Sequence, residues 1–288
     1  MITFLHPHFS YLVEKIPGAK IIQFEKFSDG WPRIFLEEKE KIAGSKITYI
    51  GDFRYVDDFF GQIAFLDGVA RYSPEEMDII IPFFPAASME RDTPSGELSI
   101  ANVFARLLGT IGERHPGRVQ IHLYDIHDER EIFYFPANLQ IHHHTTSTIL
   151  KKEILSGGKN PVILFPDAGA KKAFSRFFSD YEIVTCAKVR KSPTEIEMYF
   201  EGGNLEGREV FIIDDHIRSG GTLVEACRYA REKGAPRVSA FAPHAVFAEG
   251  VKSSFLDAFD AFYTTDTIPE NHARFQGSEK VKVLDFWF

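Results

Sequence analysis

Short apolar runs recur along the chain, and segments with helical periodicity separate them. The runs lie at residues 20–27, 46–53, 77–84, 120–126, 161–166, 208–214 and 237–244. Several of them are continuously apolar instead of alternating, which is typical of parallel strands that are covered on both faces. Strands that alternate with helices indicate an α/β fold with mostly parallel sheets.

Two of the intervening segments have a clear helical pattern. In residues 98–114, five apolar positions recur at spacings of one, three and four and are expected to share one face: Val103, Phe104, Leu107, Leu108 and Ile111. In residues 222–233 the same pattern places three residues on one side: Leu223, Ala226 and Ala230. Gly234 is expected to end this second helix, because glycine tolerates the left-handed conformation of a helix C-terminus.

The strand–helix pattern runs twice, with a polar stretch at residues 142–160 between the two runs. We expect a crossover helix in this stretch and therefore two α/β halves, residues 1–145 and 146–288. The three consecutive histidines at 142–144 are interpreted as surface residues. Adjacent residues of a strand or helix point in different directions, so three such histidines rarely share one metal ion.

Composition and charge narrow the class of protein. The chain has 288 residues, 44% of them hydrophobic, and a net charge of −8, so it offers no overall attraction to nucleic acid or to an anionic membrane. No apolar run approaches the ~20 residues of a membrane helix, and the N-terminus does not have the pattern of a signal peptide. Cys186 and Cys227 have neither disulfide-scaffold nor metal-ligand spacing. We therefore expect a cytoplasmic protein without a nucleic-acid or membrane partner.

The apolar run 208–214 ends in two carboxylates, Asp214 and Asp215, and a short polar loop follows: Arg218, Ser219, Gly220, Gly221 and Thr222. Backbone N–H groups, hydroxyls and the positive end of the following helix suit a phosphate. The carboxylates can accept hydrogen bonds from sugar hydroxyls, or their charge can be matched by a divalent cation. Alternatively, Asp215 only caps the helix and the glycines only form a tight turn. Two acids directly after an apolar strand favour the sugar-phosphate site.

At this loop the sequence resembles a known family. "VFIIDDHIRSGGT" (210–222) is similar to the phosphoribosyl-diphosphate (PRPP) binding loop of type I phosphoribosyltransferases and of PRPP synthetases, and this loop does not separate the two groups. "FSDGWPRI" (27–34), "FPDAGAKKAF" (165–174) and "AKVRK" (187–191) are similar to segments of the synthetases. Across nearly its whole length the chain resembles a ribose-phosphate diphosphokinase.

Two segments resemble a particular branch of that family. "SMER" (88–91) and "DIHDEREIFYF" (125–135) are similar to the plant class II synthetases, which are generally independent of inorganic phosphate and less sensitive to nucleotide feedback. The commonest bacterial and animal form differs at 87–91 and has a Glu where Trp31 stands. These departures leave the details of adenine recognition open.

The resemblance implies a fold, a reaction and a cofactor. The fold would consist of two similar type I phosphoribosyltransferase-like domains, each a mostly parallel sheet flanked by helices. Residues 1–145 would contribute ATP and metal residues, and residues 146–288 would contribute the ribose 5-phosphate/PRPP loop and the catalytic loop. The reaction would transfer the diphosphoryl group of ATP to the 1-hydroxyl of ribose 5-phosphate, giving PRPP and AMP, with Mg²⁺ as cofactor.

The resemblance also implies a role for individual residues. Catalysis would rest on Lys188 and Arg190, and metal binding on His127 and Asp167. The ribose 5-phosphate/PRPP site would comprise Asp214, Asp215, Arg218, Ser219, Gly220, Gly221 and Thr222. The ATP site would comprise Phe27, Asp29, Trp31, Glu90 and Arg91. In the family the segment of Phe27 completes the ATP site of a neighbouring subunit, so a homo-oligomer with its ATP site near a subunit interface is implied.

Several of these residues have a plainer interpretation. Lys188 and Arg190 are also consistent with a solvated basic patch, Arg91 with a surface ion pair, and Phe27 with a core residue. At the level of the whole chain, a non-catalytic PRPP-synthetase-like regulatory subunit remains an alternative, although such proteins typically have a disrupted catalytic loop or sugar-phosphate motif. A nucleobase phosphoribosyltransferase ranks last, because it would leave the first half of the chain unexplained.

Overall fold

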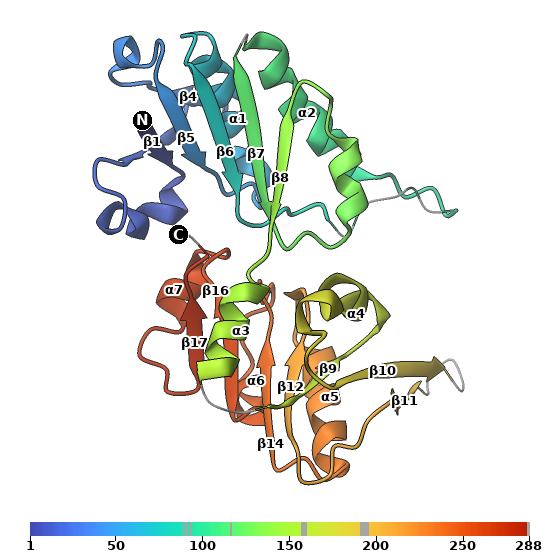
Figure 1. Cartoon of the computed structure of the whole chain (residues 1–288). Coiled ribbons are helices and arrows are strands. Elements are labelled where there is room, and N and C mark those ends of the chain that lie inside the picture. The colour runs from blue at the N-terminus through green and yellow to red at the C-terminus, as the bar shows by residue number, and fades with distance from the viewer. Residues whose placement is uncertain are drawn as a thin grey trace. The chain divides into compact units, whose positions relative to one another are not determined.

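The computed structural model describes residues 1–87, 89, 92, 94–115, 117–156, 160–190 and 196–286. The chain divides into two compact units, Met1–His144 and Thr145–Phe288 (Figure 1). Each unit contains one large sheet and its own hydrophobic core. Within the described part of the chain, no helix is long and apolar enough to span a membrane.

The first unit is built on a parallel sheet in the order β2-β1-β5-β6-β7-β8. Its strands are β1 (Ile2–Leu5), β2 (Lys20–Ile21), β5 (Lys46–Ile50), β6 (Glu76–Ile81), β7 (Arg118–Tyr124) and β8 (Gln140–His144). Its helices are α1 (Val56–Ala70) and α2 (Ile100–Arg114), with 3-10 helices η1 (Pro7–Glu14), η2 (Lys39–Lys41) and η3 (Glu129–Tyr134). A separate antiparallel hairpin joins β3 (Phe24–Lys26) to β4 (Pro32–Ile34).

Helices α1 and α2 pack on the same face of this sheet (Figure 1). Side chains alternate along a strand, so β7 sends Val119, Ile121 and Leu123 into the core, while the residues between them are only half-buried. The predicted helix 98–114 is confirmed, but its predicted apolar face is too wide. Val103 and Leu107 are 53% and 39% exposed, because the core takes up a narrower stripe of the helix.

The second unit has a sheet in the order β11-β10-β9-β12-β14-β16-β17, parallel except for the β10–β11 pair. Its strands are β9 (Val162–Phe165), β10 (Ile183–Arg190), β11 (Ile196–Glu201), β12 (Glu209–Ile213), β14 (Arg237–Phe241), β16 (Ala261–Thr265) and β17 (Val281–Leu284), with a small pair β13 (His216–Ile217) and β15 (His244–Ala245). Its helices are α3 (Ser147–Ser156), α4 (Ala168–Phe174), η4 (Ser175–Phe178), α5 (Gly221–Glu232), α6 (Ser253–Ala258) and α7 (Glu270–Arg274).

Both faces of the second sheet are apolar and covered. One face packs with residues of α5, and the predicted stripe of Leu223, Ala226 and Ala230 is buried there. The other face packs with residues of α3, α4 and η4. Gly234 has a φ of +87°, which confirms that the helix 222–233 ends in the left-handed conformation glycine favours.

Two sequence expectations need correction. The run 20–27 is not one strand, because it is split between β2 and the hairpin strand β3. The stretch 142–160 was expected to be helical, whereas residues 140–144 form the edge strand β8 and only α3 is helical. The histidines at 142–144 are therefore half-buried strand residues and not plain surface residues.

Candidate functional site

Three carboxylates gather at the carboxyl edge of the second sheet. Strands β9 and β12 are parallel neighbours, so the residues that follow them lie at the same edge. Asp214 and Asp215 follow β12 directly, and Asp167 follows β9, where its side chain accepts a hydrogen bond from the N–H of Ala170 (2.9 Å) at the start of α4. The structure therefore brings Asp167 close to two adjacent acids that lie about fifty residues later in the sequence.

Asp214 has an unusual electrostatic environment. It is buried, and burial raises the pKa of its carboxyl group well above the usual range, with further increases from the neighbouring charges of Asp215 and Asp167. Its Oδ1 accepts a hydrogen bond from the N–H of Asp215 (3.0 Å). Asp215 in turn accepts at Oδ1 from the N–H of His216 (2.7 Å). A divalent cation or hydroxyl donors at this edge would offset the mutual repulsion of these carboxylates, so the acids fit a magnesium ion or a sugar.

The loop after these acids requires glycine at one position. Gly220 has a φ of +83° and immediately precedes α5, and a Cβ there would lie 2.5 Å from the ring of Phe255. Both the left-handed backbone and the packing against Phe255 exclude a larger residue. Arg218 and Ser219 are exposed beside the N-terminus of α5. The loop can therefore present N–H groups, a hydroxyl and a guanidinium to an anion.

The proposed catalytic pair lies on the last residues of β10. The sequence placed Lys188 and Arg190 in a catalytic loop, whereas the structure has their backbone in strand β10, with Met198 and Ile196 as antiparallel partners on β11. Their side chains lie outside the described part of the structure. Glu90 and Arg91, predicted to contact ATP, also lie outside the described residues.

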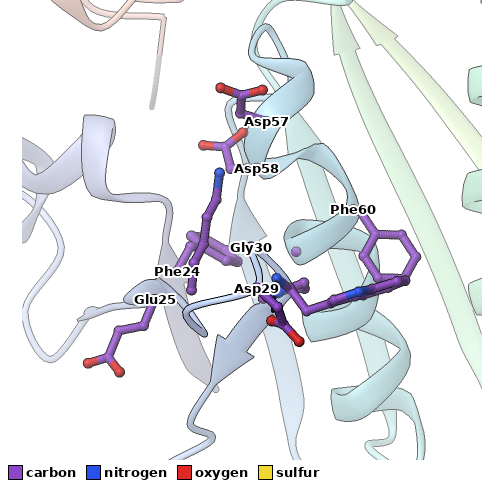
Figure 2. A pocket seen from close by; sticks show the side chains of 11 residues that line it. Phe24, Glu25, Asp29, Gly30, Asp57, Asp58 and Phe60 are labelled. Carbon is purple, nitrogen blue, oxygen red and sulfur yellow. Dashed lines mark hydrogen bonds between the residues drawn. The ribbon is translucent and has the colours of Figure 1, made fainter.

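Three of the predicted ATP residues, Phe27, Asp29 and Trp31, lie on the β3–β4 hairpin. Asp29 and Trp31 line a pocket of about 330 Å³, together with Phe60 and two acids of α1, Asp57 and Asp58 (Figure 2). The Trp31 and Phe60 rings meet edge to face with centroids 5.6 Å apart, and Trp31 is 61% exposed. The pocket thus offers an aromatic surface for stacking and carboxylates for hydrogen bonding.

Phe27, at the turn of the same hairpin, is exposed, so its interpretation as a core residue is wrong. Its ring faces the guanidinium of Arg33, which lies 5.7 Å from the ring centroid. His127, the predicted metal ligand, is exposed in the loop between β7 and η3. Asp125 is buried and has a φ of +39°, an uncommon conformation for a residue other than glycine.

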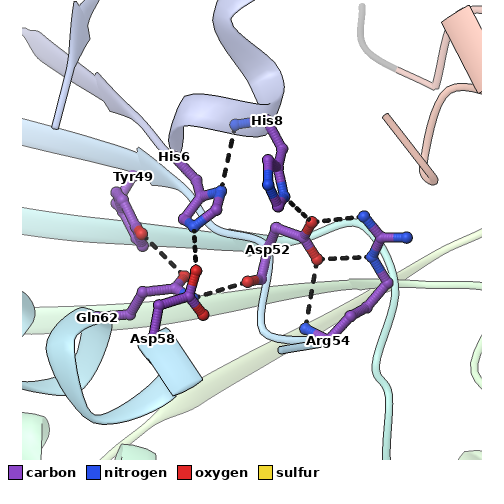
Figure 3. A network of polar contacts seen from close by, with 7 residues as sticks. All are labelled: His6, His8, Tyr49, Asp52, Arg54, Asp58 and Gln62. Atoms are coloured by element: carbon purple, nitrogen blue, oxygen red, sulfur yellow. Dashed lines mark hydrogen bonds and ion pairs between the residues drawn. The ribbon is translucent and has the colours of Figure 1, made fainter. Parts of the chain in front are cut away.

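A polar network at the carboxyl ends of β1 and β5 was not predicted from the sequence (Figure 3). Burial opposes ionisation of Asp52, but hydrogen bonds from Arg54 and His8 hold the pKa of its carboxyl well below the usual range. Arg54 binds both oxygens of Asp52, at 2.7 and 2.5 Å, and His8 Nδ1 lies 2.7 Å from Oδ2. His6 Nε2 donates to Asp58 (3.0 Å). The only sequence signal for it is that polar residues follow both strands.

His6, His8 and Asp52 offer ligand atoms within 4.8 Å of one another, a spacing that suits a metal ion. The guanidinium of Arg54 already neutralises Asp52, and His6 Nδ1 accepts the backbone N–H of His8 (3.3 Å). A cation would have to displace both contacts. We therefore interpret the cluster as an ion-pair network that holds β1, β5 and the start of α1 together.

A second unpredicted cluster lies on the sheet face opposite α1 and α2. His122 Nδ1 and His144 Nε2 are 2.9 Å apart, and His122 Nε2 faces Asp78 Oδ1 at 3.3 Å. His142 Nε2 donates to Gln120 (2.8 Å), whose amide donates to Asp78 (2.8 Å). Burial lowers the pKa of His144, and the neighbouring histidines lower it further. The sequence signal was the alternation of polar and apolar residues in 118–124, together with polar residues at every second position of 140–144: Gln140, His142 and His144.

Comparison with known proteins places these sites in context. No protein-family model matches the chain. A rice (Oryza sativa subsp. japonica) protein named ribose-phosphate pyrophosphokinase 4 is 33% identical over 259 residues, 86% of this chain and 79% of the relative. A spinach (Spinacia oleracea) protein named ribose-phosphate pyrophosphokinase 3, mitochondrial, is 31% identical over 92% of this chain and 69% of its own length. A Pyrococcus furiosus ribose-phosphate pyrophosphokinase is 29% identical over 89% and 88% of the two chains.

The fold has a close counterpart among solved structures. The crystal structure of phosphoribosylpyrophosphate synthetase from Mycobacterium smegmatis matches 99% of this chain and 94% of its own, with a TM-score of 0.79 and 20% identity. This likeness confirms the predicted fold, two phosphoribosyltransferase-like domains with mostly parallel sheets. With more than 30% identity to relatives over most of both chains, the chain belongs to the ribose-phosphate pyrophosphokinase family.

Proposed function

We propose that this chain is a PRPP synthetase, which transfers the diphosphoryl group of ATP to the 1-hydroxyl of ribose 5-phosphate and releases PRPP and AMP. The observation that carries the proposal is the carboxyl edge of the second sheet. There, Asp214, Asp215 and Asp167 lie together, and the glycine loop follows at the N-terminus of α5. The family membership supplies the reaction.

The residues of the second unit have complementary parts in this proposal. The 5-phosphate binds at residues 218–222, where backbone N–H groups and the helix N-terminus favour an anion. Asp214 and Asp215 accept hydrogen bonds from the ribose hydroxyls and fix the ribose, so that the 1-hydroxyl is directed at the incoming diphosphate. Lys188 and Arg190 lie two residues apart in an extended segment, so we assign both to the same side, on the transferring group.

The reaction forms a bond between the 1-oxygen of ribose and the β-phosphorus of ATP. The bond from the β-phosphorus to the oxygen it shares with the α-phosphorus breaks, AMP leaves with that electron pair, and the proton of the 1-hydroxyl passes to water. Asp167 and His127 would hold Mg²⁺, which when bound offsets the negative charge of the phosphates. Cationic side chains and the loop then position the phosphates, and little else is required of the protein in this type of transfer.

The first unit is proposed to supply the nucleotide site. Asp29 and Trp31 line the hairpin pocket and Phe27 lies at its turn, which suits stacking and hydrogen bonding of a base. Glu90 and Arg91 are assigned to ATP by resemblance alone. We also propose residues 1–145 and 146–288 as the two functional domains, in a homo-oligomer in which the hairpin reaches a neighbouring subunit's ATP site. A cytoplasmic location stays a prediction, since the spinach relative is named mitochondrial.

One assay tests the proposal. Purified protein with ATP, ribose 5-phosphate and Mg²⁺ should form AMP and PRPP in equal amounts, and omission of ribose 5-phosphate should abolish AMP formation. Lys188→Ala should lower turnover at least ~100-fold while binding ribose 5-phosphate almost as tightly as the unmodified chain. Absence of AMP with any nucleoside triphosphate, with and without inorganic phosphate, would refute the proposal.

A further inference from the structure

A segment that follows β14, residues 243–248, runs beside the chain that leads from Asp215 into the phosphate loop. We name it the bracing segment. Its strand β15 pairs with β13. The N–H of His244 donates to the carbonyl of Asp215 (3.3 Å), and the N–H of Ala248 donates to the carbonyl of Arg218 (3.0 Å). The backbone from the second acid to the start of the phosphate loop is therefore bonded to the bracing segment at both ends.

Phe247 gives the bracing segment an uncommon backbone conformation. Its φ is +48°, which is unfavourable for a residue other than glycine. This conformation lets successive N–H groups point the same way, and those of Val246 and Phe247 both donate to the carbonyl of Ile217 (3.0 and 3.1 Å). The buried ring of Phe247 meets that of Phe255 edge to face at 5.0 Å, and Phe255 is also the ring against which Gly220 packs. The same aromatic cluster therefore supports the bracing segment and the phosphate loop.

His244 is held by a buried chain of hydroxyl groups. Its Nδ1 lies 2.9 Å from Oγ1 of Thr267, which lies 2.8 Å from Oγ1 of Thr265. The Thr265 hydroxyl donates to the carbonyl of Pro243 (2.9 Å). With one hydrogen on each hydroxyl, all these contacts are satisfied when Thr267 donates to Thr265 and His244 donates from Nδ1 to Thr267. The hydrogen bonds thus form a ring that begins and ends on the bracing segment, and each member depends on the next because an unpaired buried donor is costly.

Arg274, at the end of α7, holds the bracing segment from another element. Its Nη1 donates to the carbonyls of Ala245 (3.3 Å) and Val246 (3.4 Å), and to Oδ1 of Asn271 (2.9 Å). Asn271 is fully buried, and its Nδ2 donates to the carbonyl of Thr265 (3.3 Å). The guanidinium and the hydroxyl ring are therefore parts of one network.

This network has a use in the binding of a sugar phosphate. Arg218 and Ser219 are exposed, so burial of their own side chains does not order the phosphate loop. A loop that becomes ordered only when its ligand arrives loses affinity, because ordering costs conformational entropy. Misplacement of a reacting group by about 1 Å can also slow a reaction roughly 100-fold. Main-chain bonds to the bracing segment fix the loop and the acid before it in advance.

We propose that His244, Thr267 and Arg274 are positioning residues of the ribose 5-phosphate site. They hold the bracing segment, and the bracing segment keeps Asp215 and the phosphate loop in the arrangement that binds the sugar phosphate. The identity of the ligand rests on the proposed function, whereas the constraint on the loop belongs to the chain without ligand. The constraint is therefore measured separately from the reaction.

The test combines hydrogen exchange of the full chain without ligand and calorimetric titration with ribose 5-phosphate and, separately, with ATP. Thr267→Val keeps the shape of the side chain but leaves the Nδ1 hydrogen of His244 without its acceptor. Exchange of the amides of residues 246–248, which donate to the loop, should become at least ~10-fold faster, and the Kd for ribose 5-phosphate should rise about tenfold. The Kd for ATP, assigned to the first unit, should not change.

Thr267→Ser restores the hydroxyl and should return both values to within about twofold of the unmodified chain. Thr264→Val is the matched control on β16, because the Thr264 hydroxyl donates only to the carbonyl of Pro243 (3.3 Å) among the described contacts, and that carbonyl keeps the Thr265 hydroxyl as donor. Both values should again stay within about twofold. Arg274→Met removes the bonds to the carbonyls of Ala245 and Val246 and should raise the Kd for ribose 5-phosphate roughly three- to fivefold.

A Thr267→Val variant that binds ribose 5-phosphate as tightly as the unmodified chain would overturn the positioning role, even if it melts at a lower temperature. Equal losses of affinity for ribose 5-phosphate and ATP would also overturn it, because they would indicate general destabilisation. An unmodified chain that binds ribose 5-phosphate but forms no AMP would refute the proposed reaction, and the predicted differences between the Thr267 variants would still support the positioning role.

Discussion

The two sheets of this protein have the same class of topology but differ in how their faces are used. In the second unit the central strands contribute apolar side chains to both faces of the sheet, and separate clusters of side chains cover the two faces. In the first unit β6, β7 and β8 have one apolar face, toward α1 and α2, while the other has a ladder of polar residues. A parallel sheet is usually covered on both faces, so the first unit is the exception.

The polar face is stable because its side chains bind one another across the strands. Asp78 on β6 and Gln120 on β7 are register partners, and His142 on β8 lies two residues beyond the register partner of Gln120. Hydrogen bonds join the three side chains. Cross-strand pairs of this kind stabilise a sheet without a covering layer. The two units show that one fold can stabilise a sheet face in two ways. Apolar helices can bury the face, or polar side chains on neighbouring strands can form hydrogen bonds with one another.

The largest expected difference between the two faces comes from truncating one residue on each. Ile163→Ala on β9 removes a fully buried side chain from the second unit and should lower the free energy of unfolding by roughly 2–5 kcal/mol. His142→Ala on β8 removes a half-buried side chain with one hydrogen bond, and should cost about 1 kcal/mol or less. Urea unfolding of both variants measures the difference. Equal losses would mean that the polar face is also tightly packed.

Two neighbouring glycines of the phosphate loop at the functional edge of the second unit should respond differently to substitution by alanine. Gly220→Ala combines a positive φ with a Cβ placed 2.5 Å from Phe255, so it should cost roughly 1–3 kcal/mol and weaken ribose 5-phosphate binding at least tenfold. Gly221→Ala meets nothing closer than 4.0 Å and should be tolerated. Calorimetric binding and thermal melts compare the two. A Gly221→Ala variant as damaged as Gly220→Ala would contradict the steric explanation.

The two units should also respond oppositely to acid. The pKa of Asp214 is raised in the folded state by burial and by nearby carboxylates. At pH values just above the ordinary carboxyl pKa, Asp214 is therefore protonated in the folded chain and ionised in the unfolded chain. The stability of the second unit should therefore rise as the pH falls from 7 toward 4. Asp214→Asn removes this dependence and should raise stability at pH 7 by about 1 kcal/mol while lowering activity. Hydrogen exchange that resolves the two units, without metal, measures the change.

In the first unit, His115 should cause the smallest of these changes in stability. Its pH dependence should be opposite in sign to that of Asp214. Burial lowers its pKa, and neither ring nitrogen has a hydrogen-bond partner among the described residues. The neutral form is favoured in the folded state, so stability is full above the unfolded pKa of about 6.5 and falls as the pH drops below it. His115→Leu should flatten this loss, by a few tenths of a kcal/mol between pH 7 and 5.5. Hydrogen exchange of α2 at the two pH values measures it.

Much of the fold could be predicted because the second unit follows the simplest rules. Its strands are continuously apolar, and its helix 222–233 has a regular stripe that ends in glycine. The carboxyl edge with Asp214 and Asp215 followed from the position of two acids after such a strand. The proximity of Asp167 depends on strand order, which a local pattern does not determine.

The first unit was harder to predict for the same physical reason that makes it unusual. Strand β8 contains one apolar residue, Ile141, and is otherwise as polar as a loop, so its histidines were interpreted as surface residues beside a helix. The apolar stripe of α2 is wider than the core needs, so periodicity assigned Val103 and Leu107 to the buried face. Networks such as that of Asp52 and Arg54 join residues from separate segments, and no spacing in the sequence marks them.

The contact between His122 and His144 has a consequence for proton movement. The two rings are nearly parallel, at 12°, and nitrogens 2.9 Å apart cannot lie across stacked faces, so the hydrogen bond runs close to the plane of the rings. With Asp78 as acceptor, His122 carries its hydrogen on Nε2, and His144 then donates from Nε2 to His122 Nδ1. When a proton arrives at His144, the hydrogen on His144 Nε2 can move along this hydrogen bond to His122 Nδ1, and neither ring has to turn. The hydrogen bond between the two histidines is therefore a path along which a proton can move from one strand to the next.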